Sequence, residues 1–120
     1  MSDTIHVLSI PTSGSPAATD LHPDLDSLQT AIGGALEALT LDPDRGVTMF
    51  LDDEGKTKYL PVNELATLVA EQHHPGFVFR DVIVGDVIIA GRDSRGNTAD
   101  VPSDIIDQVT TLEDHRRRTA

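Results

Sequence analysis

The chain has no cysteine and no tryptophan, and only one tyrosine and three phenylalanines. The absence of cysteine excludes disulfide bonds, thiolate zinc sites and a cysteine nucleophile. The longest apolar runs fall far short of the ~20 residues that a membrane-spanning helix needs. The first residues, M-S-D-T-I-H-V, also lack the basic and apolar regions of a signal peptide. We therefore expect a cytoplasmic protein without membrane contact.

Basic residues are also scarce. Nine Lys and Arg stand against twenty Asp and Glu, which gives a net charge of −11. Three of the nine are Arg116, Arg117 and Arg118, so residues 1–114 carry a net charge of −14. A body with this charge repels polyanions, and we expect it not to bind nucleic acid directly. The acidic residues either keep the protein in solution or face a basic partner.

The length of 120 residues favours one domain. Apolar periodicity predicts a single α+β domain over residues 1–112, with a mobile loop at about 11–23 and a frayed, arginine-rich tail at 113–120. We expect a short, mostly antiparallel sheet with two main helices packed on it and a short C-terminal helix. The predicted strands are 4–10, 47–51, 56–60, 87–90 and 98–101, and the predicted helices are 24–39, 64–72 and 105–109.

Two adjacent glycines, Gly33 and Gly34, fall inside the first of these helices. An apolar stripe supports that helix, at Leu25, Leu28, Ile32, Leu36 and Leu39. Each interior glycine costs a helix roughly 0.5–1 kcal/mol relative to alanine. The favoured interpretation is close packing of the helix on the sheet. The alternative is a break at the pair, with backbone N–H groups available to a ligand or partner.

No catalytic or metal site is predicted. The acidic turn D-D-E-G at 52–55 lacks the spacing of a calcium loop, and we interpret it as the tip of a hairpin between 47–51 and 56–60. His73 and His74 are adjacent and cannot share a helical face. The serines lack a G-x-S-x-G context and the histidines are scattered. We expect no enzyme activity, no metal and no cofactor.

Four segments in this order resemble a known family. They are L-Q-T-A-I-G-G-A-L-E at 28–37, V-T-M-F-L-D-D-E-G at 47–55, L-P-V-N-E-L-A-T at 60–67 and D-V-I-V-G-D-V-I-I-A-G at 81–91. Together they resemble the domain of unknown function thirty-eight forty-six, found in phages, plasmids and actinobacterial genomes. The resemblance covers roughly residues 4–110 and implies an accessory protein of a phage or mobile element in the bacterial cytoplasm. It implies no established chemistry.

The resemblance also singles out positions. The candidate binding residues are Gln29, Gly33, Gly34, Asn63, Thr67 and Asp86, and the family pattern further includes Ala66 and Gly85. Most have a structural interpretation, since glycines permit unusual dihedrals and Asn63 can cap a helix. Gln29 and Thr67 are harder to explain in this way. If both lie near Gly33 and Gly34, they form a small pocket or an interaction surface.

The leading hypothesis is a non-enzymatic module that binds a protein partner with a basic surface, through an acidic face or an exposed sheet edge. Self-association into a homo-oligomer through an edge strand is a related hypothesis. A second is an acidic DNA mimic or anti-defence inhibitor. A third is a protein that binds or sequesters a small ligand such as a nucleotide signal. An anionic ligand would require convergence of Arg45, Arg80, Arg92 and Arg95.

Overall fold

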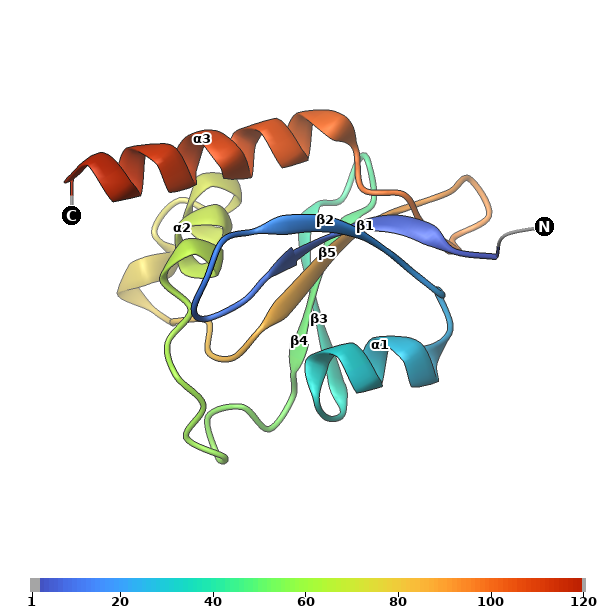
Figure 1. Cartoon of the computed structure of the whole chain (residues 1–120), viewed down its shortest axis with the longest axis horizontal. Helices are drawn as coiled ribbons and strands as arrows, with labels where there is room; N and C mark the ends of the chain where they lie inside the picture. Colours follow the sequence, from blue (N-terminus) through green and yellow to red (C-terminus); the bar gives the residue numbers. More distant parts are fainter. Residues whose placement is uncertain (1–2, 120) are drawn as a thin grey trace.

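Six strands form one antiparallel sheet in the computed structural model, which describes residues 3–119 apart from the side chain of Thr119 (Figure 1). The strands run in the order β2-β1-β5-β4-β3, and β6 pairs with the end of β5. The elements are β1 (Ile5–Ile10), β2 (Ala17–Leu21), α1 (Leu25–Ile32), β3 (Leu36–Asp42), β4 (Val47–Asp52), α2 (Glu64–His73), the 3₁₀ helix η1 (Phe77–Phe79), β5 (Val87–Arg92), β6 (Thr98–Ala99) and α3 (Ser103–Thr119). The predicted fold class, a single α+β domain, is confirmed.

Helices cover both faces of the sheet. The central strand β5 is buried on both sides, so its alternate side chains enter two cores. Val87 and Ile89 join the larger core under α2 and α3, whereas Ile88 and Ala90 join a smaller core under α1. Figure 1 shows α3 above the sheet, α2 to its left and α1 below it. Residues on α1 and on α2 are therefore separated by the sheet.

The predicted helix over 24–39 is wrong beyond residue 32. Helix α1 ends at Ile32, where Gly33 adopts a left-handed conformation with φ +95°, and β3 begins three residues later. The favoured interpretation, close packing of a continuous helix on the sheet, is therefore wrong. The alternative, a break of the helix at the glycine pair, is correct. Leu36 and Leu39 fit the helical stripe by spacing, but they are strand residues opposite Asp52 and Met49 of β4.

The hairpin is also different from the prediction. Strand β4 pairs with β3 through the turn at 43–46, and the predicted strand at 56–60 is instead a series of turns.

The range 11–23, predicted as a loop, contains β2, which pairs with β1 at the edge of the sheet. The C-terminal helix is longer than predicted, because α3 continues through Thr119 and includes most of the predicted frayed tail. Residue 120 lies outside the described part of the chain.

No helix within residues 3–119 is both long enough and apolar enough to cross a membrane.

Candidate functional site

The glycine pair ends α1 and leaves room for an ion pair. The N–H groups of Gly33 and Gly34 both donate to the carbonyl oxygen of Gln29, at 2.7 and 3.1 Å. These donors are therefore occupied, which argues against their use by a ligand. A Cβ on Gly34 would lie 2.6 Å from the Lys58 ammonium and 2.8 Å from a carboxylate oxygen of Asp52. A side chain at position 34 would therefore displace the end of Lys58 or of Asp52.

The Asp52–Lys58 ion pair fixes the segment that we call the Tyr59 loop, residues 53–62. Asp52 is 4% exposed, and its Oδ2 accepts a hydrogen bond from Lys58 Nζ at 2.7 Å. Its Oδ1 accepts the backbone N–H of Glu54 at 2.8 Å. The hydrogen bond from Lys58 holds the pKa of Asp52 below its usual value and raises the pKa of Lys58. Both groups are therefore charged at neutral pH, and the loop is tied to the end of β4.

Asn63 joins three segments through its side chain. Its amide nitrogen donates to the carbonyl oxygens of Ile10 and Gly85, both at 2.9 Å. Its amide oxygen accepts the N–H of Ala66 at 3.0 Å, as expected for the N-cap of α2. The predicted cap at Asn63 is thus confirmed. The whole residue is 1% exposed, so these bonds serve the structure.

Thr67 and Asp86 also make structural bonds. The hydroxyl of Thr67 donates to the Asn63 carbonyl at 2.8 Å and accepts the N–H of Ile83 at 2.9 Å. Thr67 is buried, so its hydroxyl is fully used inside the protein. Asp86 is exposed, and its carboxylate accepts the N–H of Thr12 at 2.9 Å. These contacts hold the segments before β5 and after β1 in place.

The six predicted site residues do not form one pocket. Gln29, Gly33 and Gly34 lie at the end of α1, and Thr67 lies in α2 on the opposite face of the sheet. Asn63 lies on the same side of the sheet as Thr67, because it is the N-cap of α2. The hypothesis of a pocket shared by Gln29 and Thr67 is therefore wrong, because the sheet separates their two helices.

A cavity of about 100 Å³ lies between the ends of β3 and β4 and the segment that follows α2. Its floor is apolar and its rim is acidic. The floor includes Leu39, Leu51, Phe77 and Ile83, and the charged residues around it are Glu37, Asp52, Asp53, Lys56 and Asp81. This volume is below the ~300–1,000 Å³ of sites for drug-sized ligands and cofactors. The cavity is suited to one side chain.

The rim carries more negative than positive charge. Lys56 of the Tyr59 loop makes an ion pair with Asp81, which follows η1. The hydrogen bond that Lys56 donates to Asp81 lowers the pKa of that carboxyl group. Glu37 and Asp53 are exposed and make no ion pair with any residue of the described range 3–119. Carboxylates from three separate segments, Glu37, Asp53 and Asp81, therefore line the cavity together with the Lys56 ammonium group.

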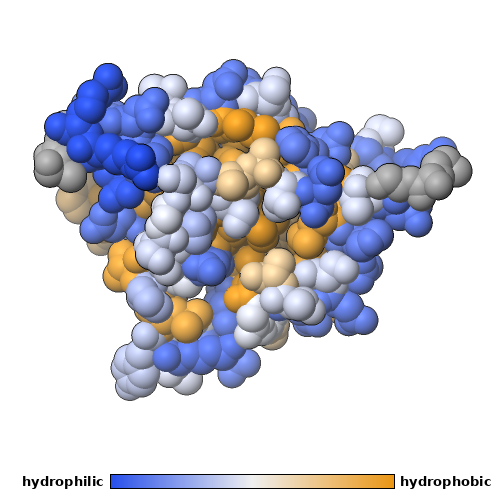
Figure 2. Space-filling model, in the orientation of Figure 1, coloured by the Kyte–Doolittle hydropathy of each residue, from blue (hydrophilic) through white to orange (hydrophobic). Residues whose placement is uncertain are grey.

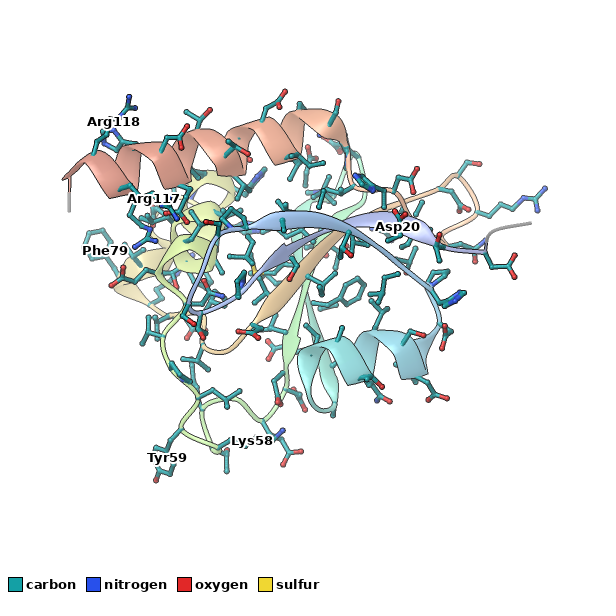
Figure 3. The ribbon with its side chains drawn as sticks, in the orientation of Figure 1. Asp20, Lys58, Tyr59, Phe79, Arg117 and Arg118 are labelled. Atoms are coloured by element: carbon teal, nitrogen blue, oxygen red, sulfur yellow. The ribbon has the colours of Figure 1, made fainter. Side chains whose placement is uncertain are left out.

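Two aromatic side chains extend into solvent beside this cavity. Tyr59 is 92% exposed and Phe79 is 90% exposed, although the whole sequence has only four aromatic residues. Figure 3 shows Tyr59 at the lower end of the molecule and Phe79 at its left, with both side chains pointing away from the ribbon. Figure 2 shows exposed apolar atoms among hydrophilic ones on this side. We call the region the Tyr59–Phe79 surface, comprising Lys56, Tyr59, Val62, Val78, Phe79, Asp81 and the cavity with its rim.

The backbone segments that carry the two aromatic residues are held by their surroundings. The Tyr59 loop is closed by the Asp52–Lys58 pair, and Tyr59 itself has φ +58°, an unusual conformation for a non-glycine residue. Phe79 lies on η1, which is anchored by the buried Phe77. The carboxylate of Glu71 also accepts the N–H groups of Gly76 and Val78, at 2.9 and 3.1 Å. Sequence reasoning missed this surface, although aromatic residues in the polar contexts K-T-K-Y and V-F-R-D were a signal.

The four arginines proposed for an anionic ligand do not converge. Arg45 and Arg92 line one open hollow of about 400 Å³, but Arg45 is paired with Asp42 and Asp104. Arg80 caps η1, and neither Arg80 nor Arg95 lines that hollow. Within residues 3–119, no three His, Asp or Glu side chains are arranged to hold a metal ion.

A family model described as Domain of unknown function (DUF3846) matches residues 5–114. The chain belongs to this family, as the four sequence segments indicated. Neither a curated protein nor a solved structure matches the sequence.

Proposed function

We propose that this chain is a non-enzymatic accessory protein of a phage or mobile element that acts in the bacterial cytoplasm by binding a protein partner. The observation that carries the proposal is the exposure of Tyr59 and Phe79 on two fixed segments. An exposed aromatic side chain contributes none of the free energy that its burial would supply. Aromatic residues are also enriched among the residues that dominate the binding energy of protein interfaces. A partner that covers them gains that energy at little cost in backbone conformational entropy.

The charge around these residues specifies the partner further. Asp53 and Glu54 belong to the Tyr59 loop, Glu37 lines the cavity beside it, and none of the three has an ion-pair partner among the described residues. Such a rim attracts a basic surface and speeds association at low salt. The partner is therefore a protein with basic residues around an apolar patch. Added salt weakens the complex, because exposed charges are screened over about 10 Å at 0.1 M ionic strength.

The other hypotheses gain less support. A DNA mimic needs carboxylates in an extended array, whereas Asp44, Asp53 and Asp93 belong to separate turns. An anionic small ligand lacks the arginine cluster that it requires. Self-association through the exposed edge strand β2 remains a competing proposal, which a native mass spectrum distinguishes directly.

The experiment begins with native mass spectrometry of the freshly purified protein, followed by capture of partners from host lysate at low salt. The double variant Y59A/F79A should lose a captured protein that the unmodified chain retains. Leu25→Ala is the matched control, because Leu25 is also an exposed apolar residue, 59% accessible, but lies on α1. Equal capture by the double variant and the control overturns the proposal. So does a retained small molecule that the double variant still binds.

A further inference from the structure

We infer that the partner inserts a lysine side chain into the cavity between the Tyr59 loop and η1, with apolar residues beside that lysine covering Tyr59 and Phe79. This inference rests on the proposed function and specifies the chemistry of the partner. It depends on three features of the Tyr59–Phe79 surface: the size and floor of the cavity, the arrangement of charge at its rim, and the position of the two aromatic residues.

The cavity fits the stem of one long side chain. Its volume is about 100 Å³, and Leu39, Leu51 and Phe77 contribute to its floor. Lysine and arginine side chains bury their methylene groups against apolar surface while the charged end stays near water. The apolar floor with an acidic rim matches that division. A nucleotide or a large cofactor requires several times this volume.

The rim favours an ammonium group over a guanidinium group. Glu37 comes from β3, Asp53 follows β4, and Asp81 follows η1, so carboxylates from three segments line the cavity. An ammonium group has three donors that rotate about the Cε–Nζ bond, whereas a guanidinium group is a flat fork suited to one carboxylate. The chain's own Lys56 already places an ammonium group against Asp81. Glu37 and Asp53 are left to receive a second one.

The two aromatic residues lie on the segments that the Lys56–Asp81 pair connects. Tyr59 is in the same loop as Lys56, and Phe79 is two residues before Asp81. The cavity is lined by both segments, so a chain that places a lysine in it meets the segment that carries Tyr59 and the segment that carries Phe79. Apolar neighbours of that lysine would cover both rings and bury the apolar area that neither segment buries alone.

The test is a titration of the full, ¹⁵N-labelled chain followed by amide NMR shifts at low salt. The probe is N-acetyl-lysinamide, and its matched uncharged control is N-acetyl-norleucinamide. The expected result is a set of shifts at residues 37–39, 51–53 and 77–84 with the lysine probe and none with the norleucine probe. Equal binding of N-acetyl-argininamide overturns the preference for an ammonium group. If 1,4-diaminobutane binds more tightly than the lysine probe, the cavity is a site for free diamines, and the inference that the lysine belongs to a partner protein is wrong.

Two rim variants test the geometry without breaking an existing ion pair. Glu37→Gln and Asp53→Asn should each weaken binding of the lysine probe about two- to five-fold, the range for one exposed charge contact. The matched control is Asp107→Asn, which removes an exposed carboxylate on α3 and should leave the affinity unchanged. If all three variants weaken binding of the lysine probe equally, the affinity depends on net charge alone and the proposed site in the cavity is wrong.

The two proposals fail separately. If the lysine probe causes no local shifts but Y59A/F79A loses its captured partner, the lysine inference is wrong and the proposed function stands. If the probe binds as expected but Y59A/F79A captures the same proteins as the Leu25→Ala control, the cavity binds lysine and the proposed docking role of the aromatic residues is wrong.

Discussion

The carboxylate of Asp52 and the ammonium group of Lys58 lie 2.7 Å apart, and both lie within 3 Å of where a Cβ on Gly34 would be. This relationship accounts for the second glycine of the pair. The first glycine has a separate role, because Gly33 supplies the positive φ that ends α1. The pair therefore redirects the chain from helix to strand and makes room for a loop contact.

The two glycines should respond differently to substitution. Gly34→Ala should reduce the free energy of unfolding by about 1–3 kcal/mol, since its Cβ would clash with the Asp52–Lys58 pair. Gly33→Ala meets no atom within 4 Å and should lose about 1–2 kcal/mol through its positive φ. Gly33→Asn should lose less than Gly33→Ala, because asparagine tolerates that conformation. Urea unfolding at neutral pH measures all three, and a fully stable Gly34→Ala variant would contradict this account.

Acidification should destabilise the protein through depressed carboxylate pKa values. The pKa values of Asp52, Glu71 and Asp81 are all lower in the folded state than their ordinary values. Their stabilising contribution is therefore complete above the unfolded pKa of about 4 and is lost as the pH falls through the folded values. Urea unfolding between pH 7 and pH 2.5 measures this loss.

The Asp52–Lys58 pair should contribute to pH dependence at both extremes. Lys58 has a raised pKa, so its contribution is complete below the unfolded pKa of about 10.4 and is lost as the pH rises through the folded value. Asp52→Asn should flatten both the acid and the alkaline dependence relative to the unmodified chain. Asp107→Asn, on the surface of α3, should leave the profile unchanged. An unchanged profile for Asp52→Asn would contradict the assigned pKa shifts.

Loss of the Asn63 side chain should be among the more damaging polar substitutions. Asn63→Ala removes the α2 cap and leaves the buried carbonyl groups of Ile10 and Gly85 without their amide donor, so we expect a loss of about 2–4 kcal/mol. Asn63→Asp keeps an acceptor for Ala66 but places a carboxylate against two carbonyls, and it should be at least as destabilising. Thermal unfolding of the two variants tests this, and a milder effect of Asn63→Asp would show that the cap dominates.

The exposed aromatic residues should matter little for stability. Phe79→Ala should change the free energy of unfolding by less than about 0.5 kcal/mol, whereas Phe77→Ala should cost about 3–5 kcal/mol. Tyr59→Gly should stabilise the chain or leave it unchanged, since glycine accommodates φ +58° without strain. Urea unfolding measures each change. A large loss of stability for Phe79→Ala would assign it a structural role and weaken its use as a binding probe.

Local patterns predicted some elements well because nearby residues determine them. Asn63 before E-L-A-T-L-V-A-E-Q predicts a capped helix, and α2 begins at Glu64 as expected. The apolar run at 87–90 predicts a buried strand, and β5 is the central strand of the sheet. The prediction for 24–39 failed because Leu36 and Leu39 fit the helical spacing, whereas pairing with β4 makes them strand residues on opposite faces of the sheet. The predicted strand at 56–60 failed because β4 pairs with β3 and β5 instead.

The sequence by itself determined the acidic charge, the exclusion of cysteine chemistry, the α+β class and the family. Only the tertiary structure decided that Gln29 and Thr67 lie on opposite faces of the sheet, and that Lys56 of the Tyr59 loop meets Asp81 after η1. Composition and short-range patterns depend on neighbours in the chain. Lys56 and Asp81 are 25 residues apart, and their contact depends on how the sheet, α2 and the Tyr59 loop fold together.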